Sequence, residues 1–289
     1  MSRNFPIVSI TGASGAGTTT VHKVIVDICQ SLGVRAAFVE GDSFHRYDRS
    51  EMAALIREWE RTAGRTISHF GPEANLLSEL EALFQRFGKS GSGRIRHYIH
   101  NEGEASIHGG QPGTFTAWKD IEAGTKMLVY EGLHGGAKVD DIDIAHHVDL
   151  LIGVTPIVNL EWIQKLHRDQ NERGRSVEDV TDTILRRMPD YIKYIVPQFS
   201  QTDINFQRIP LVDTSNPFAE RDIPDPEESL VIIRFRIPDA FEMRQLLDSF
   251  EFSRISRSDS LVIRGEDLPS AMRTILSPRI EKLLRDSES

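Results

Sequence analysis

One stretch near the start of the chain decides its fold: Pro6-Ile7-Val8-Ser9-Ile10-Thr11-Gly12-Ala13-Ser14-Gly15-Ala16-Gly17-Thr18-Thr19. The part before the glycines is apolar and rich in β-branched residues, which is typical of a buried parallel strand. Residues 19–31 then follow helical periodicity, and a second strand is predicted over 35–40. Strand, glycine turn, helix and strand in this order predict an open α/β sheet.

The glycine cluster has the spacing of a phosphate-binding loop. Gly12 and Gly17 fit the pattern G-x-x-x-x-G-K-[ST], and Thr19 stands where the magnesium-binding hydroxyl belongs. Backbone N–H groups in such a loop point inward, and the following helix N-terminus adds positive potential for phosphate. The alternative interpretation of this glycine cluster is a generic tight turn between a strand and a helix. We expect ATP and Mg²⁺ to bind at Gly12, Ala13, Ser14, Gly15, Ala16, Gly17, Thr18, Thr19 and Thr20.

Thr18 departs from this pattern, because a lysine is normal at its position. That lysine places a point charge on the terminal phosphates, so a catalytic chain needs another cation in its place. A helix predicted over 159–170 carries Lys165, Arg168 and Asp169 on one side, by the i, i+3, i+4 rule. These side chains are our candidates for the missing charge.

A second basic group, Arg173 and Arg175, follows on either side of Gly174, which breaks the helix. A mobile basic segment can close over phosphates and withdraw for product release, so we predict a lid over about 168–180. A solvated charged face is the alternative for both basic groups. The absent loop lysine favours the functional interpretation.

Carboxylates stand at the ends of two predicted strands. Asp42 follows the strand at 35–40, and Glu131 ends another at 126–130. Binding sites of open α/β sheets lie at the carboxyl ends of parallel strands. Asp42 could accept the proton of a substrate hydroxyl, and Glu131 could bind magnesium directly or through water. Alternatively, Asp42 could be a helix N-cap and Glu131 a turn residue.

Basic and aromatic residues near Asp42 indicate what the acceptor is. His45, Arg46 and Arg49 follow it directly, which suggests a phosphorylated acceptor. The polar segment 88–113 is too long for an idle connection. Within it, four residues alternate at period two and would share one face of an extended segment: Arg94, Arg96, Tyr98 and His100. Such a face suits a sugar phosphate, and a polar strand at an exposed edge is the alternative interpretation.

The remaining pattern completes the fold class. Further strands are predicted over 149–154, 209–213, 230–236 and 260–263, and further helices over 51–61, 73–87, 177–194 and 268–284. We predict an α/β, P-loop NTPase-like (nucleoside-monophosphate-kinase-like) open sheet with helices on both faces. Its core strands are parallel, and a C-terminal extension at about 222–289 makes the sheet mixed. One kinase domain is expected over 1–289.

Composition excludes several classes of protein. The 289 residues carry a net charge of −9, a poor match for a nucleic-acid-binding surface. The single cysteine, Cys29, excludes an internal disulfide and a cysteine-built zinc site. The apolar runs are far shorter than the about 18 residues of a membrane span, and no signal peptide is visible. We expect a cytoplasmic protein that binds neither nucleic acid nor membrane.

Five blocks of sequence resemble the phosphoribulokinase family in its bacterial form. They are TGASGAGT at 11–18, EGDSFHR at 40–46, YEGLHG at 130–135, NLEWIQK at 159–165 and IVPQFSQTDINFQR at 195–208. The last block is long and highly specific. Together the blocks span most of the chain as far as Pro217, and the match is looser beyond that residue.

This resemblance implies transfer of the ATP γ-phosphate to O1 of ribulose 5-phosphate, giving the ribulose 1,5-bisphosphate of the Calvin cycle. By motif match it implies Asp42 as general base, Asp169 as a further acid that binds magnesium, and Glu131 as the strand-end acid. The residues implied at the ATP phosphates and the transition state are Lys165, Arg168 and Arg173. Those implied to hold the sugar phosphate are His45, Arg49, Tyr98 and His100.

The bacterial class also implies an oligomer, often an octamer, that NADH activates and AMP inhibits. The residues implied at that effector site are Arg186, Arg187, Arg234 and Arg257. The redox control of the plant class needs a cysteine pair, which this chain lacks.

Two rival functions remain at this point. A uridine-kinase-like nucleoside kinase shares the fold and the Arg-Gly-Arg lid, but it usually keeps the loop lysine and does not need a basic acceptor set. A nucleotide sensor that binds ATP without catalysis would explain Thr18, although Asp42 and Lys165 argue against it.

Overall fold

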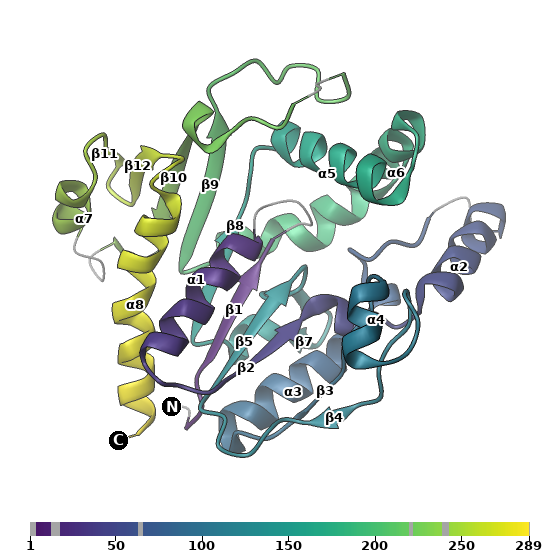
Figure 1. Cartoon of the computed structure of the whole chain (residues 1–289), viewed down its shortest axis with the longest axis horizontal. Coiled ribbons are helices and arrows are strands. Elements are labelled where there is room, and N and C mark those ends of the chain that lie inside the picture. Colours follow the sequence, from purple (N-terminus) through teal and green to yellow (C-terminus); the bar gives the residue numbers. More distant parts are fainter. Residues whose placement is uncertain (1–3, 13–17, 63–65, 220–221, 239–242, 289) are drawn as a thin grey trace.

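The computed structural model describes residues 4–12, 18–62, 66–219, 222–238 and 243–288. A mixed sheet forms its centre (Figure 1), built from β1 (Ile7–Thr11), β2 (Ala36–Glu40), β5 (Met127–Gly132), β8 (Leu150–Val154), β9 (Ile204–Pro210), β10 (Ser229–Phe235), β11 (Arg254–Arg257) and β12 (Ser260–Arg264). The eight strands lie in the order β11-β12-β10-β9-β8-β1-β5-β2. The C-terminal strands therefore continue the sheet that the N-terminal strands begin.

One half of the sheet is parallel and the other is antiparallel. β2, β5, β1, β8 and β9 run in the same direction, whereas β10, β12 and β11 join by antiparallel pairing. Every residue of β1 is buried, as expected for a parallel strand covered on both faces. This arrangement confirms the predicted fold class, and it brings the carboxyl ends of five strands to one edge.

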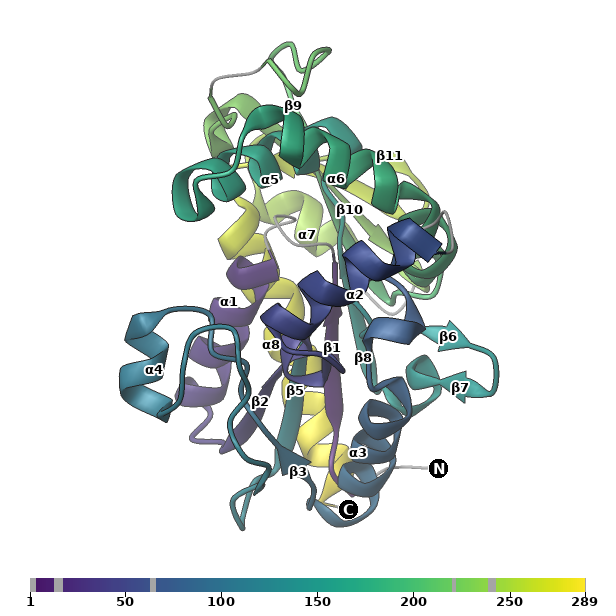
Figure 2. The same cartoon turned by 90° about the vertical axis from the view of Figure 1, so that its right-hand side faces the viewer.

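Helices cover both faces of this sheet. On one face α1 (Thr18–Ser31), α7 (Met243–Ser249) and α8 (Leu268–Ser287) pack on one apolar core, and on the other α3 (Leu77–Ser90) packs on a second. The other helices are α2 (Arg49–Thr62), α4 (Glu102–His108), α5 (Val158–Arg173) and α6 (Val177–Asp190). Figures 1 and 2 show α5 and α6 together beyond the carboxyl edge of the sheet.

Two small hairpins and a short turn complete the architecture. They are β3 (Arg94–Ile95) with β4 (Lys119–Asp120), β6 (Lys138–Val139) with β7 (Ile142–Asp143), and the 3₁₀ turn η1 (Gly41–Phe44) after β2. None of the helices within the described ranges is long and apolar enough to cross a membrane.

The prediction of a strand over 209–213 is wrong. β9 begins at Ile204 and ends at Pro210, and Leu211 beyond it is 62% exposed. The polar residues that alternate with Ile204 and Phe206 concealed the strand in the sequence, although the two apolar side chains are fully buried. Pro210 pairs with Ser229 of β10 at the end of the strand, and the Leu211 N–H still donates to the Glu228 carbonyl at 2.7 Å.

Two helix boundaries also differ from the prediction. The helix over 177–194 ends as α6 at Asp190, and a π-helical turn, η4 (Tyr191–Ile195), follows. Pro189 inside its last turn removes one N–H donor, which favours such an irregular end. The helix over 73–87 begins instead at Leu77, after a 3₁₀ turn at Pro72–Ala74.

Candidate active site

The phosphate loop leaves β1 at the carboxyl edge of the sheet. Gly12 N–H donates to the Gly132 carbonyl at 3.3 Å, so the start of the loop lies against the end of β5. Thr11 Oγ1 donates to Gln198 Oε1 at 2.9 Å, in the long block 195–208. Thr18 begins α1, on which Thr20 also lies. Ala13, Ser14, Gly15, Ala16 and Gly17, and the side chain of Thr19, lie outside the described residues.

Two glycines bring the ends of β2 and β5 into contact. A Cβ on Gly41 would lie 2.9 Å from Gly132 Cα and 2.6 Å from Tyr130 Oη. A Cβ on Gly132 would lie 2.7 Å from Gly41 Cα. Backbone atoms cannot approach so closely past a side chain, so both positions require glycine. Asp42 and Glu131, one residue from these glycines, are thereby held on neighbouring strand ends.

Asp42 lies in η1 with an imidazole on each side. The Nε2 of His45 is 3.4 Å from its Oδ1, and the Nε2 of His100 is 3.9 Å from its Oδ2. The carboxylate remains 43% exposed, so a substrate can reach it. His100 also lies 3.9 Å from Glu40 Oε2, and hydrogen bonding to Glu40 is the main reason why the pKa of His100 is raised.

His45 is buried, unlike the carboxylate beside it. Its ring stacks on His69 with centroids 3.9 Å apart. Burial is the main cause that lowers the pKa of His45, and the charges of His100, Arg96 and Arg187 act in the same direction. The surroundings therefore favour the neutral form of His45 and the protonated form of His100, the two imidazoles beside Asp42.

The other predicted acceptor residues gather around this pair. Arg49 donates from Nη2 to the His100 carbonyl at 3.0 Å, and its backbone N–H donates to the Gly113 carbonyl. The ring of Tyr98 lies 4.9 Å from that of His100 and 6.1 Å from that of His45. The structure therefore brings His45, Arg49, Tyr98 and His100 together beside Asp42.

The expectation that 94–100 forms one extended face holds only in part, because β3 covers Arg94–Ile95 alone. Arg94 reaches the Trp118 carbonyl at 3.5 Å. Arg96 points instead toward η1, where Nε donates to the Ser43 carbonyl at 2.8 Å and Nη2 to the His45 carbonyl at 2.7 Å. Its guanidinium lies 3.7 Å from the centre of the Phe115 ring. Arg96 thus holds the turn that carries Asp42.

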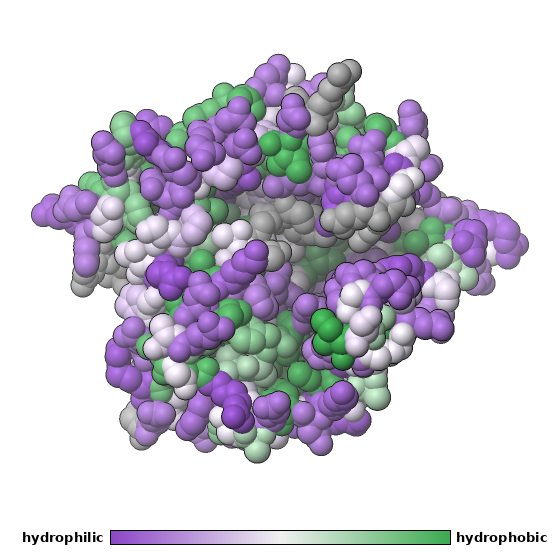
Figure 3. All heavy atoms as spheres, viewed as in Figure 1, coloured by the Kyte–Doolittle hydropathy of each residue, from purple (hydrophilic) through white to green (hydrophobic). Residues whose placement is uncertain are grey.

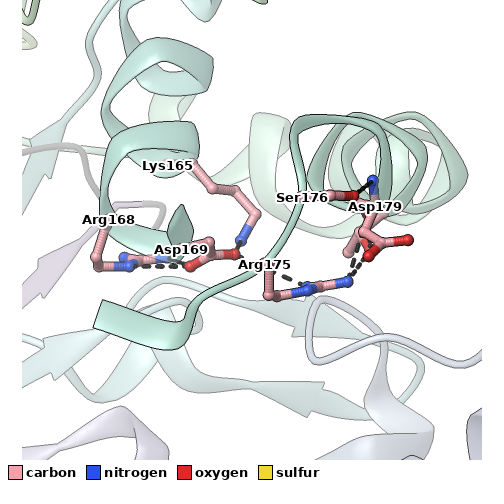
Figure 4. A network of polar contacts seen from close by, with 7 residues as sticks. Lys165, Arg168, Asp169, Arg175, Ser176 and Asp179 are labelled. Carbon is pink, nitrogen blue, oxygen red and sulfur yellow. Dashed lines mark hydrogen bonds and ion pairs between the residues drawn. The ribbon is translucent and has the colours of Figure 1, made fainter. Parts of the chain in front are cut away.

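A second charged cluster lies on α5 (Figure 4). Asp169 is fully buried there, and it accepts from Lys165 Nζ at 2.9 Å and from Arg168 Nη2 at 3.1 Å. Arg175 Nη1 approaches its Oδ2 to 3.9 Å. Burial, ahead of the charges of Arg187 and Arg168, lowers the pKa of Lys165 to about 8. The predicted cations are together, but they surround a carboxylate. The side chain of Arg173 lies outside the described residues.

The two carboxylates predicted to bind magnesium differ in availability. Both oxygens of Asp169 accept from cations. Glu131 is 21% exposed, and His22 of α1 lies 3.1 Å from its Oε2. Magnesium needs only one or two protein carboxylates beside phosphate oxygens and water, which matches Glu131 better. In the described part of the chain, no group of three or more His, Cys, Asp or Glu could hold a metal ion.

Several residues of the site were not singled out from the sequence. Burial raises the pKa of Glu161 to about 7, and Tyr191 Oη donates to its carboxylate at 3.1 Å. Burial lowers the pKa of His134 to about 4, so its Nε2–H donates to the Phe70 carbonyl. His69, beside Phe70, stacks on His45. These residues come from segments distant in sequence, and no spacing rule joins them.

The residues predicted at an effector site do not meet within one chain. Arg186 pairs with Glu60 of α2, while the charge of Arg187, on the same helix, acts on both His45 and Lys165. Arg234 and Arg257 both lie opposite Ser260, on the antiparallel side of the sheet. Figure 1 shows α6 and β10–β11 on opposite sides of the molecule.

The surface is hollowed on the side of the molecule where α4, α5 and α6 lie (Figure 3). Figure 3 shows the molecule hollowed between the α5–α6 pair and α4, with hydrophilic residues over most of its rim. α2 lies beside α6 in both ribbon views, and the ion pair between Arg186 and Glu60 joins the two helices (Figures 1 and 2).

Comparison with known proteins gives consistent matches. The family described as "Phosphoribulokinase / Uridine kinase family" matches residues 7–215. The phosphoribulokinase of Nitrobacter vulgaris is 51% identical over 284 residues, covering 98% of this chain and 98% of its own. That of Xanthobacter flavus is 54% identical, again over 284 residues and 98% of both chains.

A solved structure also matches over almost the whole chain. The phosphoribulokinase from "Rhodobacter spheroides" superimposes with a TM-score of 0.91 at 46% identity, over 99% of both chains.

Proposed function

This chain belongs to the phosphoribulokinase/uridine kinase family, and from that premise we propose that it is an ATP-dependent kinase that converts ribulose 5-phosphate to ribulose 1,5-bisphosphate. The observation that carries this proposal is the cluster around Asp42. An exposed carboxylate at a strand end, flanked by His45, Arg49, Tyr98 and His100, suits a hydroxyl acceptor that also bears a phosphate.

Asp42 is the proposed general base. Its exposed carboxylate would accept the proton of the O1 hydroxyl as that oxygen attacks the γ-phosphorus of ATP. His45 and His100 hold the carboxylate from two sides, which orients it. Arg49 and the cationic form of His100 would attract the 5-phosphate of the sugar, and Tyr98 would bind it or a sugar hydroxyl.

The cations of α5 would take the place of the lysine that the loop lacks. Lys165, Arg168 and Arg173 would stabilise the charge of the transferred phosphoryl group. Magnesium, when bound, would neutralise part of the charge of the phosphates. Glu131 and the Thr19 hydroxyl are the residues that would hold it, and Asp169 would serve by holding the cations.

The finer predictions stay part of this proposal. We propose a single kinase domain whose segment at about 168–180 closes as a lid, and a cytoplasmic enzyme of the Calvin cycle. We further propose a homo-oligomer as large as an octamer, activated by NADH and inhibited by AMP. Arg186 and Arg187 of one chain would then need Arg234 and Arg257 of another, because one chain does not bring them together.

A coupled assay of ADP release with several acceptors tests the function. With ATP and Mg²⁺, we expect turnover of ribulose 5-phosphate and none of uridine or pantothenate. Turnover of uridine alone would replace the proposal by a nucleoside kinase. ATP binding in calorimetry without turnover of any acceptor would replace it by the nucleotide sensor.

A further inference from the structure

Arg175, one of the described cations around Asp169, is fixed to a different helix from the one that carries Lys165 and Arg168. Gly174 ends α5 with φ +63°, a left-handed conformation that favours glycine, and turns the chain back on itself. The N–H of Arg175 consequently donates to the Asp169 carbonyl at 3.2 Å. Ser176 then caps α6 by accepting from Asp179 N–H at 3.1 Å. Backbone geometry alone therefore returns residue 175 to Asp169.

The side chain of Arg175 is anchored on α6 (Figure 4). Its Nη2 donates to Thr183 Oγ1 at 2.9 Å and to the Asp179 carbonyl at 3.3 Å. Its Nη1 meanwhile stays 3.9 Å from Asp169 Oδ2, the oxygen that also accepts from Lys165. Arg175 thus reaches the buried carboxylate while its guanidinium is anchored on α6.

Lys165 makes fewer hydrogen bonds than Arg175. Among the described residues its ammonium hydrogen-bonds only Asp169, whereas the guanidinium of Arg175 donates to Thr183 and to the Asp179 carbonyl. In the proposed reaction Lys165 must leave this carboxylate to meet the phosphoryl group. Asp169 is fully buried. If no other cation stayed beside it when Lys165 left, its carboxylate would be a buried charge without compensation, which is strongly unfavourable.

Resting on the proposed function, we propose that Arg175 is a positioning residue that remains with Asp169 when Lys165 moves to the phosphates. Among the described residues, three cations lie around this carboxylate, so one can depart while the buried charge stays paired. The anchors on Thr183 and Asp179 keep Arg175 from following the phosphates. It acts through Lys165 and does not itself touch the nucleotide.

The test compares wild type with Arg175→Gln, Arg175→Lys and Thr183→Val. Affinities for ATP and for the transition-state mimic ADP–aluminium fluoride are measured by calorimetry without acceptor, beside kcat and KM for ATP. We expect Arg175→Gln to lower kcat and affinity for the mimic about tenfold to a hundredfold. ATP affinity should change by less than about threefold, because Lys165 acts chiefly on the transition state. Arg175→Lys should restore part of the loss.

Each other outcome overturns the proposal. Equal weakening of ATP and of the mimic would make Arg175 a direct phosphate ligand. Arg175→Gln and Thr183→Val could lose kcat and mimic affinity equally, with equal falls in Tm and no recovery in Arg175→Lys. Arg175 would then only stabilise the packing of the two helices. Unchanged affinity for the mimic in Arg175→Gln would show that Arg175 does not position Lys165. These measurements do not depend on the acceptor, so a wild type inactive on ribulose 5-phosphate would count only against the proposed function.

Discussion

Two aspartates of the candidate active site lie in opposite surroundings. Asp42 stands in a turn at a strand end, 43% exposed, with imidazoles at 3.4 and 3.9 Å. Asp169 lies in the middle of a charged cluster, fully buried, with Lys165 at 2.9 Å and two guanidiniums nearby. The sequence offers the same residue type at both places, and only the fold distinguishes them.

The difference assigns each carboxylate a different task. A carboxylate that exchanges protons with a substrate must be reachable, and Asp42 is. A buried carboxylate among cations accepts their hydrogen bonds and so orients them instead. Pairs of titratable groups in contrasting environments are a common way to separate acid–base work from electrostatic work.

The largest expected effect comes from removing the exposed carboxylate. Asp42→Asn keeps the shape of the side chain but cannot accept a proton, so we expect kcat to fall by about 10²- to 10⁴-fold at little changed KM. Steady-state kinetics with ribulose 5-phosphate measures both constants. Asp48→Asn is the matched control, because Asp48 accepts from the Ser50 and Glu51 N–H groups and from the Ser50 hydroxyl at the start of α2, and an Asn can also accept there. A turnover within tenfold of wild type in Asp42→Asn would contradict the assignment of the base.

The next effect lies on the side of the buried carboxylate. Lys165→Met removes the cation that we place on the phosphoryl group, so kcat should fall by about 10²- to 10³-fold with smaller changes in ATP affinity. Single-turnover kinetics and ATP calorimetry separate the two. Lys193→Met, on the exposed side of η4, is the control. A near-normal kcat in Lys165→Met would mean that another cation serves the loop.

A smaller effect on kcat is expected from the residue that supports Asp42 without touching the substrate. Arg96→Gln removes two hydrogen bonds to the carbonyls of η1 and the stacking on Phe115. We expect kcat to fall about tenfold to a hundredfold as the turn shifts, with a loss of about 1–3 kcal/mol in unfolding free energy. Arg94→Gln is the control, since its one long contact is to Trp118. Equal effects of the two substitutions would disprove the positioning role.

Much of this architecture could be predicted because the signals were local. The β1–loop–α1 unit, the strand ends at Asp42 and Glu131, and the cations of α5 all follow from short spacings in the sequence. β9 escaped because its polar alternate residues conceal the apolar ones, and its pairing with β8 on one side and β10 on the other leaves no local signal. The four exposed residues of β11 give no strand signal of their own, since only pairing with β12 defines it.

The site was less predictable than the fold because its contacts join distant segments. Position in the sequence placed Lys165 near Asp169, but not the burial that makes Asp169 a holder of cations. The stacking of His69 on His45 and the pairing of His22 with Glu131 depend on tertiary packing alone. The spacing of Arg94 and Arg96 suggests that both lie on one face of a strand. However, β3 covers only Arg94–Ile95, and the two side chains reach different partners, Trp118 and η1.

The last prediction concerns stability on the side of Asp169. Burial raises the pKa of Glu161 to about 7, from 4.5 for an exposed glutamate. The folded protein therefore binds this proton more tightly than the unfolded chain. Its stabilising contribution is complete below about pH 4.5 and is lost progressively as the pH rises to about 7.

Glu161→Gln should remove this dependence, because glutamine does not titrate and can still accept from Tyr191 Oη. Between pH 5 and pH 8 the wild type should lose roughly 2 kcal/mol more unfolding free energy than the variant. Urea unfolding at several pH values measures the difference, with Glu58→Gln, exposed on α2, as the control. Parallel pH profiles for wild type and Glu161→Gln would show that the carboxylate is already charged in the folded state. The contrast between a polar, reachable Asp42 side and a desolvated Asp169 side would then be weaker than the burial of Glu161 implies.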